Sequence, residues 1–107
     1  MVAFKRENQD SRWLLSDINW SKLDLTSVTP ELLAAVKTAA LVEANSGDYV
    51  IYLHNIFPND AEFKRLADIW GEEEVQHGAA LGRWAELVDP TFDFSSRVEH
   101  FRSLYQL

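Results

Sequence analysis

The sequence predicts an all-α fold: an antiparallel two-helix hairpin with an irregular N-terminal arm and a short C-terminal helix. Two segments, residues 30–57 and 60–88, repeat apolar residues at the spacing of about 3.6 residues that is typical of an amphipathic helix. Both are far longer than the average helix of about 11–12 residues, which favours a helical bundle. The turn between them, Phe57-Pro58-Asn59, is so short that the second helix must fold back beside the first.

The hairpin is predicted to span residues 29–90, because start and stop signals lie at the ends of both helices. Thr29 is a common N-cap residue, and Pro30 follows it at the first helical position. Pro58 ends the first helix, since the residue before a proline disfavours the helical conformation. The second helix is expected to open with Asn59 as its N-cap residue and to end at the next proline of the chain.

Two less regular parts flank the hairpin. Residues 1–28 are expected to form an arm whose aromatic side chains lie across the helices, because its apolar residues are spaced too irregularly for one amphipathic helix. Residues 91–107 are expected to form a loop and a short helix, which Ser96 and Glu99 open as a capping box. The chain stops at Leu107 with no capping glycine and no polar tail, so we expect it to be cut before a second half.

The composition restricts the classes of protein and of site. The chain has 107 residues, a net charge of −7 and no cysteine, which excludes disulfides, thiolate catalysis and cysteine-bound metals. Its acidity disfavours nucleic-acid binding, which depends on clusters of lysine and arginine. With no signal peptide and no apolar run of about 20 residues, a soluble cytoplasmic protein without a membrane partner is expected. Two helices cannot cover each other's apolar faces, so some partner surface is expected as well.

Three polar residues interrupt the apolar stripes at positions where core residues are due. Glu43 lies in the stripe of the first helix, and Glu74 and His77 lie in that of the second. The second stripe otherwise consists of apolar residues at helical spacing, namely Phe63, Leu66, Ala67, Trp70, Leu81, Trp84 and Val88. Burying an unpaired carboxylate costs roughly several kcal/mol of folding free energy, so another group must share or compensate its charge.

The three residues are expected to meet at one level of the hairpin. Glu43 precedes the turn by about as many residues as separate the turn from Glu74 and His77, roughly 15, so the helical rise places them side by side. Carboxylates and imidazole suit iron or manganese, which predicts a metal site. Gly47, one turn after Glu43, would leave room beside that carboxylate. His54 lies nearly three turns away and is expected to be a hydrogen-bonded residue at the core or its boundary instead of a ligand.

The local string Trp70-x-x-Glu73-Glu74-x-x-His77-Gly78 resembles the ferritin-like di-iron carboxylate proteins, and in particular the soluble acyl-carrier-protein desaturases. In that fold each half of a four-helix bundle supplies one Glu from its first helix and a Glu-x-x-His from its second. The resemblance covers residues 30–90 and implies that the hairpin is the first, N-terminal half of such a bundle.

The resemblance also implies roles for individual residues. Glu43 and His77 would be terminal ligands of a di-iron centre, or of manganese, and Glu74 would bridge the two ions. Trp70, Tyr49 and Tyr52 would lie close behind these ligands, although all three could equally be ordinary core aromatics. Catalytic residues beyond the metal ligands are not expected.

Only one Glu-x-x-His occurs in the chain, so the site would be completed by a second copy around a two-fold axis or by a missing C-terminal half. The expected function is then oxygen-activating oxidoreductase chemistry. A ferroxidase or iron-storage protein of the ferritin-like class is one alternative, suggested by half-length relatives that act as dimers. A helical dimerisation module without metal is the other alternative, because an exposed apolar stripe alone would serve that purpose.

Overall fold

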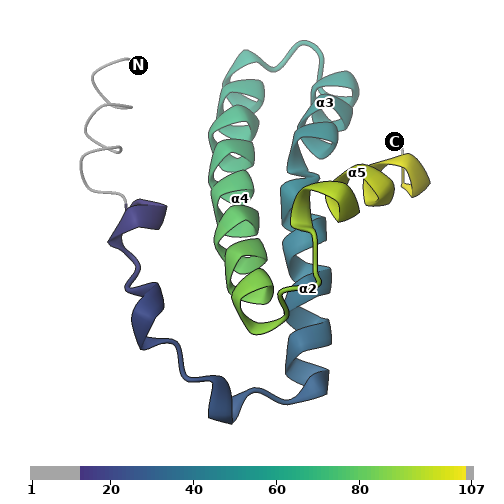
Figure 1. Ribbon diagram of the computed structural model, residues 1–107. Helices are drawn as coiled ribbons and strands as arrows, with labels where there is room; N and C mark the ends of the chain where they lie inside the picture. Colours follow the sequence, from purple (N-terminus) through teal and green to yellow (C-terminus); the bar gives the residue numbers. More distant parts are fainter. Residues whose placement is uncertain (1–12, 106–107) are drawn as a thin grey trace.

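The computed structural model describes residues 13–105, and within this range every regular element is helical and no strand is present (Figure 1). The all-α prediction is therefore confirmed. The predicted conformation of residues 1–12 and 106–107 lies outside the described residues. In chain order the elements are three single turns of 3-10 helix and four α-helices: η1 Leu15–Asp17, η2 Trp20–Lys22, η3 Leu25–Ser27, α2 Pro30–Ala44, α3 Ser46–Ile56, α4 Ala61–Val88 and α5 Phe94–Leu104.

The first long helix is not continuous, which corrects the prediction of one helix over residues 30–57. It divides at Asn45 into α2 and α3, and the backbone of Asn45 is opened to φ −88° and ψ 7°. The Asn45 amide is shared between the carbonyls of Leu41 and Val42, both at 3.2 Å, as in a tightened last turn. The run Asn45-Ser46-Gly47 joins three residues of low helix propensity, which explains the position of the break.

The helix starts are set by side-chain caps. The Thr29 hydroxyl accepts a hydrogen bond from the Leu32 amide at 3.1 Å, as expected for this N-cap. The second long helix opens one residue later than predicted, because Asp60 and not Asn59 is its cap and accepts from the Phe63 amide at 2.9 Å. Asp93 caps α5, so that helix begins before the predicted capping box.

Small residues bring α4 into close contact with α2 and α3, beside which it runs back after the turn (Figure 1). Ala67, Gly71, Gly78 and Ala85 are buried along one face of α4. A Cβ atom added at Gly78 would lie 2.7 Å from the backbone nitrogen of Ala44, so the two helices touch backbone to backbone there. This approach fixes which residues of α2 and α4 lie at the same level.

The segment after α4 folds back over the pair of helices. Lys37 of α2 donates a hydrogen bond of 2.7 Å to Asp89, the C-cap residue of α4. The Lys37 ammonium also lies over the buried ring of Phe92. This hydrogen bond, with those from Thr91, lowers the pKa of Asp89 to about 2. The ring of Phe94 then packs on Gly82, which places α5 across α2 and α4.

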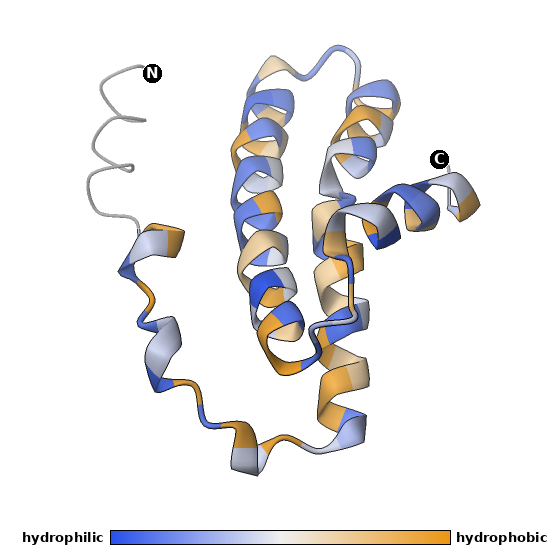
Figure 2. Ribbon diagram, viewed as in Figure 1, coloured by the Kyte–Doolittle hydropathy of each residue, from blue (hydrophilic) through white to orange (hydrophobic). Residues whose placement is uncertain are grey.

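The described part of the chain has little core of its own. Its buried apolar residues are Ala40, Ala67, Ala85 and Phe92, and no large side chain is fully buried. Apolar residues make up much of α2 and recur along α4 between hydrophilic ones (Figure 2). Leu66 and Trp70 of the predicted stripe of α4 are 50% and 43% exposed, whereas Ala67 of the same stripe is buried. Glycines that the stripe does not contain, such as Gly71 and Gly78, line the rest of the contact.

None of the described helices combines the length and the apolar character that a membrane crossing requires.

We predict that Gly78→Ala destabilises the protein by about 1–3 kcal/mol, because its methyl group would push α4 away from the backbone of Ala44. Gly47→Ala is the matched control, since a Cβ there meets nothing within 4 Å and helix propensity favours alanine by up to about 1 kcal/mol. Urea unfolding followed by circular dichroism measures both changes. Equal stabilisation by the two substitutions would contradict the close approach at Gly78.

Candidate metal centre

The contact between α2 and α4 brings Glu43, Glu74 and His77 together. Glu43 lies in the last turn of α2, and Glu74 and His77 lie one turn apart in the middle of α4. One donor atom from each residue can be chosen such that all three atoms lie within 4.8 Å of one another. Nδ1 of His77 is 3.7 Å from Oε1 of Glu74. Sequence spacing therefore predicted the correct neighbours, and their role as metal ligands stays a prediction.

One carboxylate oxygen of Glu43 is buried without a partner. Its Oε2 atom has almost no solvent-accessible surface and no hydrogen-bond partner among the described residues. Burial raises the pKa of Glu43, and the nearby carboxylate of Glu74 raises it further, while His77 acts in the opposite direction. A bound cation would offset both the cost of desolvating the Glu43 carboxylate and its repulsion by Glu74. The group of three residues therefore fits a metal ion.

The group is more open than the sequence predicts. The side chain of Glu74 is 20% exposed and that of His77 is 42% exposed, so His77 does not occupy a dry interior in the single chain. The reason is that α4 turns its small residues toward α2, which leaves the Glu-x-x-His positions on the flank of the pair. That flank is where a further element would have to lie to exclude water.

The donor set fits a first-row metal but does not complete its coordination. Carboxylate and imidazole ligands suit iron and manganese, and each binds such ions at about 2.0–2.2 Å. The three donor atoms are up to 4.8 Å apart, which is slightly farther than two ligands of one ion can be. Rotation of the Glu43 and His77 side chains would shorten these distances. Three ligands leave several positions of a six-coordinate ion free, so further ligands must come from outside this group.

His54 does not belong to the group. Its Nε2 atom lies 2.8 Å from Oδ1 of Asp68, which forms an ion pair if the imidazole is protonated. This contact joins α3 to α4 near the turn and agrees with the expectation that His54 is a boundary residue. Gly47 is exposed, with open space around it, so the structure gives no packing reason for this glycine.

The three aromatic residues expected behind the ligands lie near the surface. Trp70, Tyr49 and Tyr52 are 43%, 51% and 44% exposed. Tyr49 and Tyr52 contact each other edge to face on α3, with ring centroids 6.0 Å apart. Trp70 lies one turn before Glu74 on α4. Their role beside the ligands stays a prediction.

Sequence reasoning missed one neighbour of the group, Trp13. Its ring lies parallel to the His77 imidazole, with an interplanar angle of 8° and centroids 6.3 Å apart. The side-chain amide of Gln76 donates a hydrogen bond of 2.6 Å to the Trp13 carbonyl. The only signal in the sequence was that aromatic residues of the arm should lie across the helices, which did not single out this residue.

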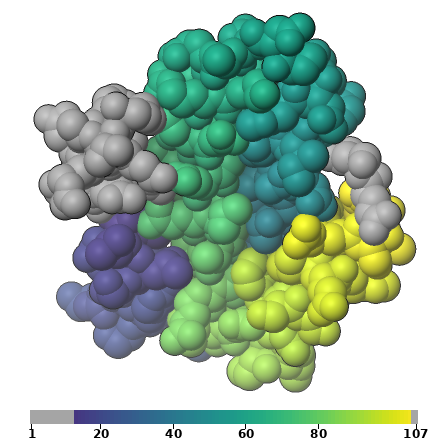
Figure 3. Space-filling view, turned by 90° about the horizontal axis from the view of Figure 1, so that it is seen from above, coloured from purple at the N-terminus to yellow at the C-terminus, as the bar shows by residue number. Residues whose placement is uncertain are grey.

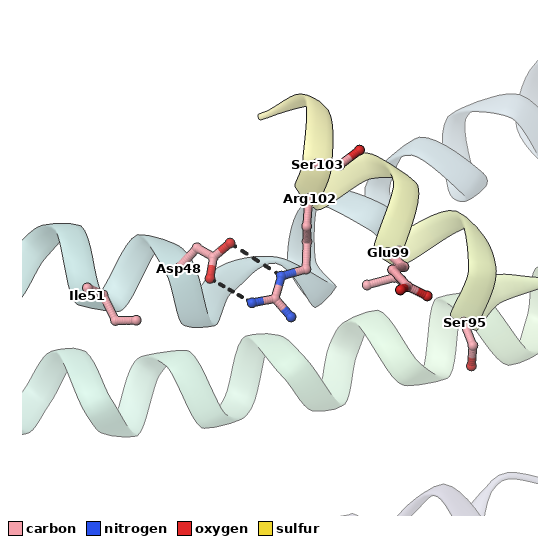
Figure 4. Close-up of a pocket in the computed structure, with 7 residues that line it drawn as sticks. Asp48, Ile51, Ser95, Glu99, Arg102 and Ser103 are labelled. Carbon is pink, nitrogen blue, oxygen red and sulfur yellow. Dashed lines mark hydrogen bonds and ion pairs between the residues drawn. The ribbon is translucent and has the colours of Figure 1, made fainter. Parts of the chain in front are cut away.

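A hollow of about 660 Å³ lies elsewhere, between α3 and α5 (Figure 4). Arg102 of α5 reaches across it to both carboxylate oxygens of Asp48, at 2.9 and 3.3 Å. Because the guanidinium is paired in this way, it fastens α5 to α3. None of the three candidate ligands lines this hollow.

Comparisons with known proteins identify no relative. No protein-family model, no curated protein and no solved structure matches the chain. The resemblance to ferritin-like proteins therefore depends on Glu43 and on the string from Trp70 to Gly78 alone.

We predict that Glu43→Gln stabilises the metal-free protein at pH 7 by a few degrees in thermal midpoint. The raised pKa means that the folded state disfavours the ionised carboxylate, so wild-type stability falls as the pH rises above the ordinary value of 4.5. Below that value the carboxyl is protonated in both states, and the difference between variant and wild type should vanish. Thermal unfolding with a chelator at pH 4 and pH 7 measures this.

Glu99→Gln is the matched control, because it removes an equal charge from an exposed position of α5. Its effect should be small and similar at both pH values. A Glu43→Gln protein that is less stable than wild type at pH 7 would show that the carboxylate is satisfied in the folded chain.

Proposed function

We propose that this chain is half of a ferritin-like di-metal carboxylate protein, with iron or manganese bound by Glu43, Glu74 and His77. The observation that carries the proposal is the buried, unpartnered Oε2 of Glu43 within reach of a second carboxylate and an imidazole. Two carboxylates held together without a cation oppose folding, whereas a divalent ion makes the same arrangement favourable.

The exposed apolar side chains support completion of the site by a second copy. Leu66 and Trp70 lie on α4 at helical spacing before Glu74 and His77, and both are about half exposed. An element packed on this flank would bury them and would exclude water from the three donors. A copy related by a two-fold axis would bring the same flank and a second set of donors, which gives six ligands for two ions. A second half of the same polypeptide would supply an equivalent set.

The proposed activity is that of an oxygen-activating oxidoreductase. Two adjacent ferrous ions, when bound, supply two electrons for the reduction of dioxygen. Glu74 would bridge the ions, and Glu43 and His77 would be terminal ligands from the two helices. Oxygen uptake by ferrous-loaded protein, absent in Glu74→Ala, is the direct assay, and iron that stays ferrous in air would reject this activity.

Two alternatives use the same surfaces differently. A ferroxidase or iron-storage role is favoured by the net charge of −7, since an acidic surface attracts cations; it predicts iron turnover within large assemblies. A helical dimerisation module without metal is favoured by the exposed apolar residues alone, and it predicts association that is indifferent to Glu74.

We predict about one iron or manganese ion per chain after anaerobic loading and removal of excess metal. Glu74→Ala should lower this content at least 10-fold, because Glu74 is the central donor of the three. Glu99→Ala is the control, since it removes an equal charge from an exposed position of α5 outside the group of three donors and should keep the metal. Metal analysis of the wild type, Glu74→Ala and the control variant measures this content. A wild-type chain without metal would reject the proposed function.

A further inference from the structure

The N-terminal arm reaches the candidate metal centre, although the two are far apart in sequence. The described part of the arm, residues 13–28, lies beside α4, with η1 in contact with that helix, while α5 lies on its other side (Figures 1 and 3). The hydrogen bond from Gln76 to the Trp13 carbonyl joins positions 63 residues apart. Because Gln76 directly precedes His77, this bond fixes the arm at the level of the candidate ligands.

The course of the arm is held by local structure as well. The Leu14 amide donates a hydrogen bond of 2.7 Å to the Asp17 carboxylate, and the Asp17 amide donates one of 2.9 Å to the Leu14 carbonyl. Farther along, Leu15 and Trp20 line a hollow shared with α4. Trp13 is thus the first described residue of a segment that has a defined path beside α4.

The indole of Trp13 stacks, with an offset, against the His77 ring. The planes differ by 8° and the centroids are 6.3 Å apart, which is within the range of offset stacking. With 42% of its side chain exposed, His77 would otherwise be free to turn about its side-chain bonds. The neighbouring ring restricts the imidazole to the orientations parallel to it.

We propose that Trp13 is a positioning residue for His77: the arm holds the imidazole in the plane from which its nitrogen reaches an ion shared with Glu43 and Glu74. The inference rests on the proposed function, because it assigns a purpose to the stacking only if a metal is bound. Groups that orient a metal-binding histidine contribute measurably to affinity. Since stacking is weaker than a hydrogen bond, its loss should weaken binding by about 2- to 10-fold.

The test is a titration of the full chain with cobalt(II), whose visible absorption reports ligand geometry as well as occupancy. Trp13→Ala should weaken binding by about 2- to 10-fold and shift the cobalt bands, whereas Trp13→Phe, which keeps an aromatic face, should restore most of both. Trp20→Ala is the matched control, because it removes an indole from the same arm where it lines the hollow beside Arg83. It should leave the affinity and the spectrum at wild-type values. Helix content by circular dichroism verifies that each variant folds.

The outcomes separate this inference from the proposed function. Wild-type chain that binds cobalt, together with unchanged affinity and bands in Trp13→Ala, overturns the positioning role and leaves the metal site standing. Equal weakening by Trp13→Ala and Trp20→Ala also overturns it, because the arm would then act only through general packing. Wild-type chain that binds no cobalt overturns the metal site and the positioning role together.

Discussion

The close approach of α4 to α2 and α3 is the constraint on which the rest of the structure depends. Gly78 lets the backbones of α4 and α2 meet, and Gly71 makes room for the Val50 side chain of α3. Ala67 and Ala85 extend the contact toward both ends of α4. A contact this tight permits little sliding of one helix along the other. Sliding would bring a residue bulkier than Gly78 against the backbone of α2, where even one added Cβ would collide. The level of Glu43 relative to Glu74 and His77 follows from this contact.

Two unsatisfied features of the single chain lie on the same flank of α4. One is electrostatic: Glu43 buries an oxygen without a partner beside a second carboxylate. The other is apolar: Leu66 and Trp70 remain about half exposed, and no large side chain of the described residues is fully buried. A cation relieves the first and a covering surface relieves the second. A second copy that carries its own donors would satisfy both at once, which is why the proposed function joins metal binding to assembly.

The sequence predicted the elements better than their faces. Thr29 and Pro58 marked the ends of the first helical segment because caps and prolines act locally, and equal distances from the turn brought Glu43 to Glu74 and His77. The break at Asn45 was missed because apolar periodicity continues through it. The close contact made by α4 was missed because the pattern gives weight to large side chains such as Trp70, whereas glycines such as Gly71 and Gly78 line that contact. The stacking of Trp13 on His77 was beyond sequence reasoning, since it joins distant positions through an irregular arm.

The most direct test of this account is the mass of the intact assembly with its metal bound. Native mass spectrometry of the chain loaded with ferrous or manganous ions reports chains and ions in a single species. The account predicts two chains with two ions, and loss of the ions should weaken the pair. Isolated single chains without metal, or pairs that form equally well with no ion, would contradict it.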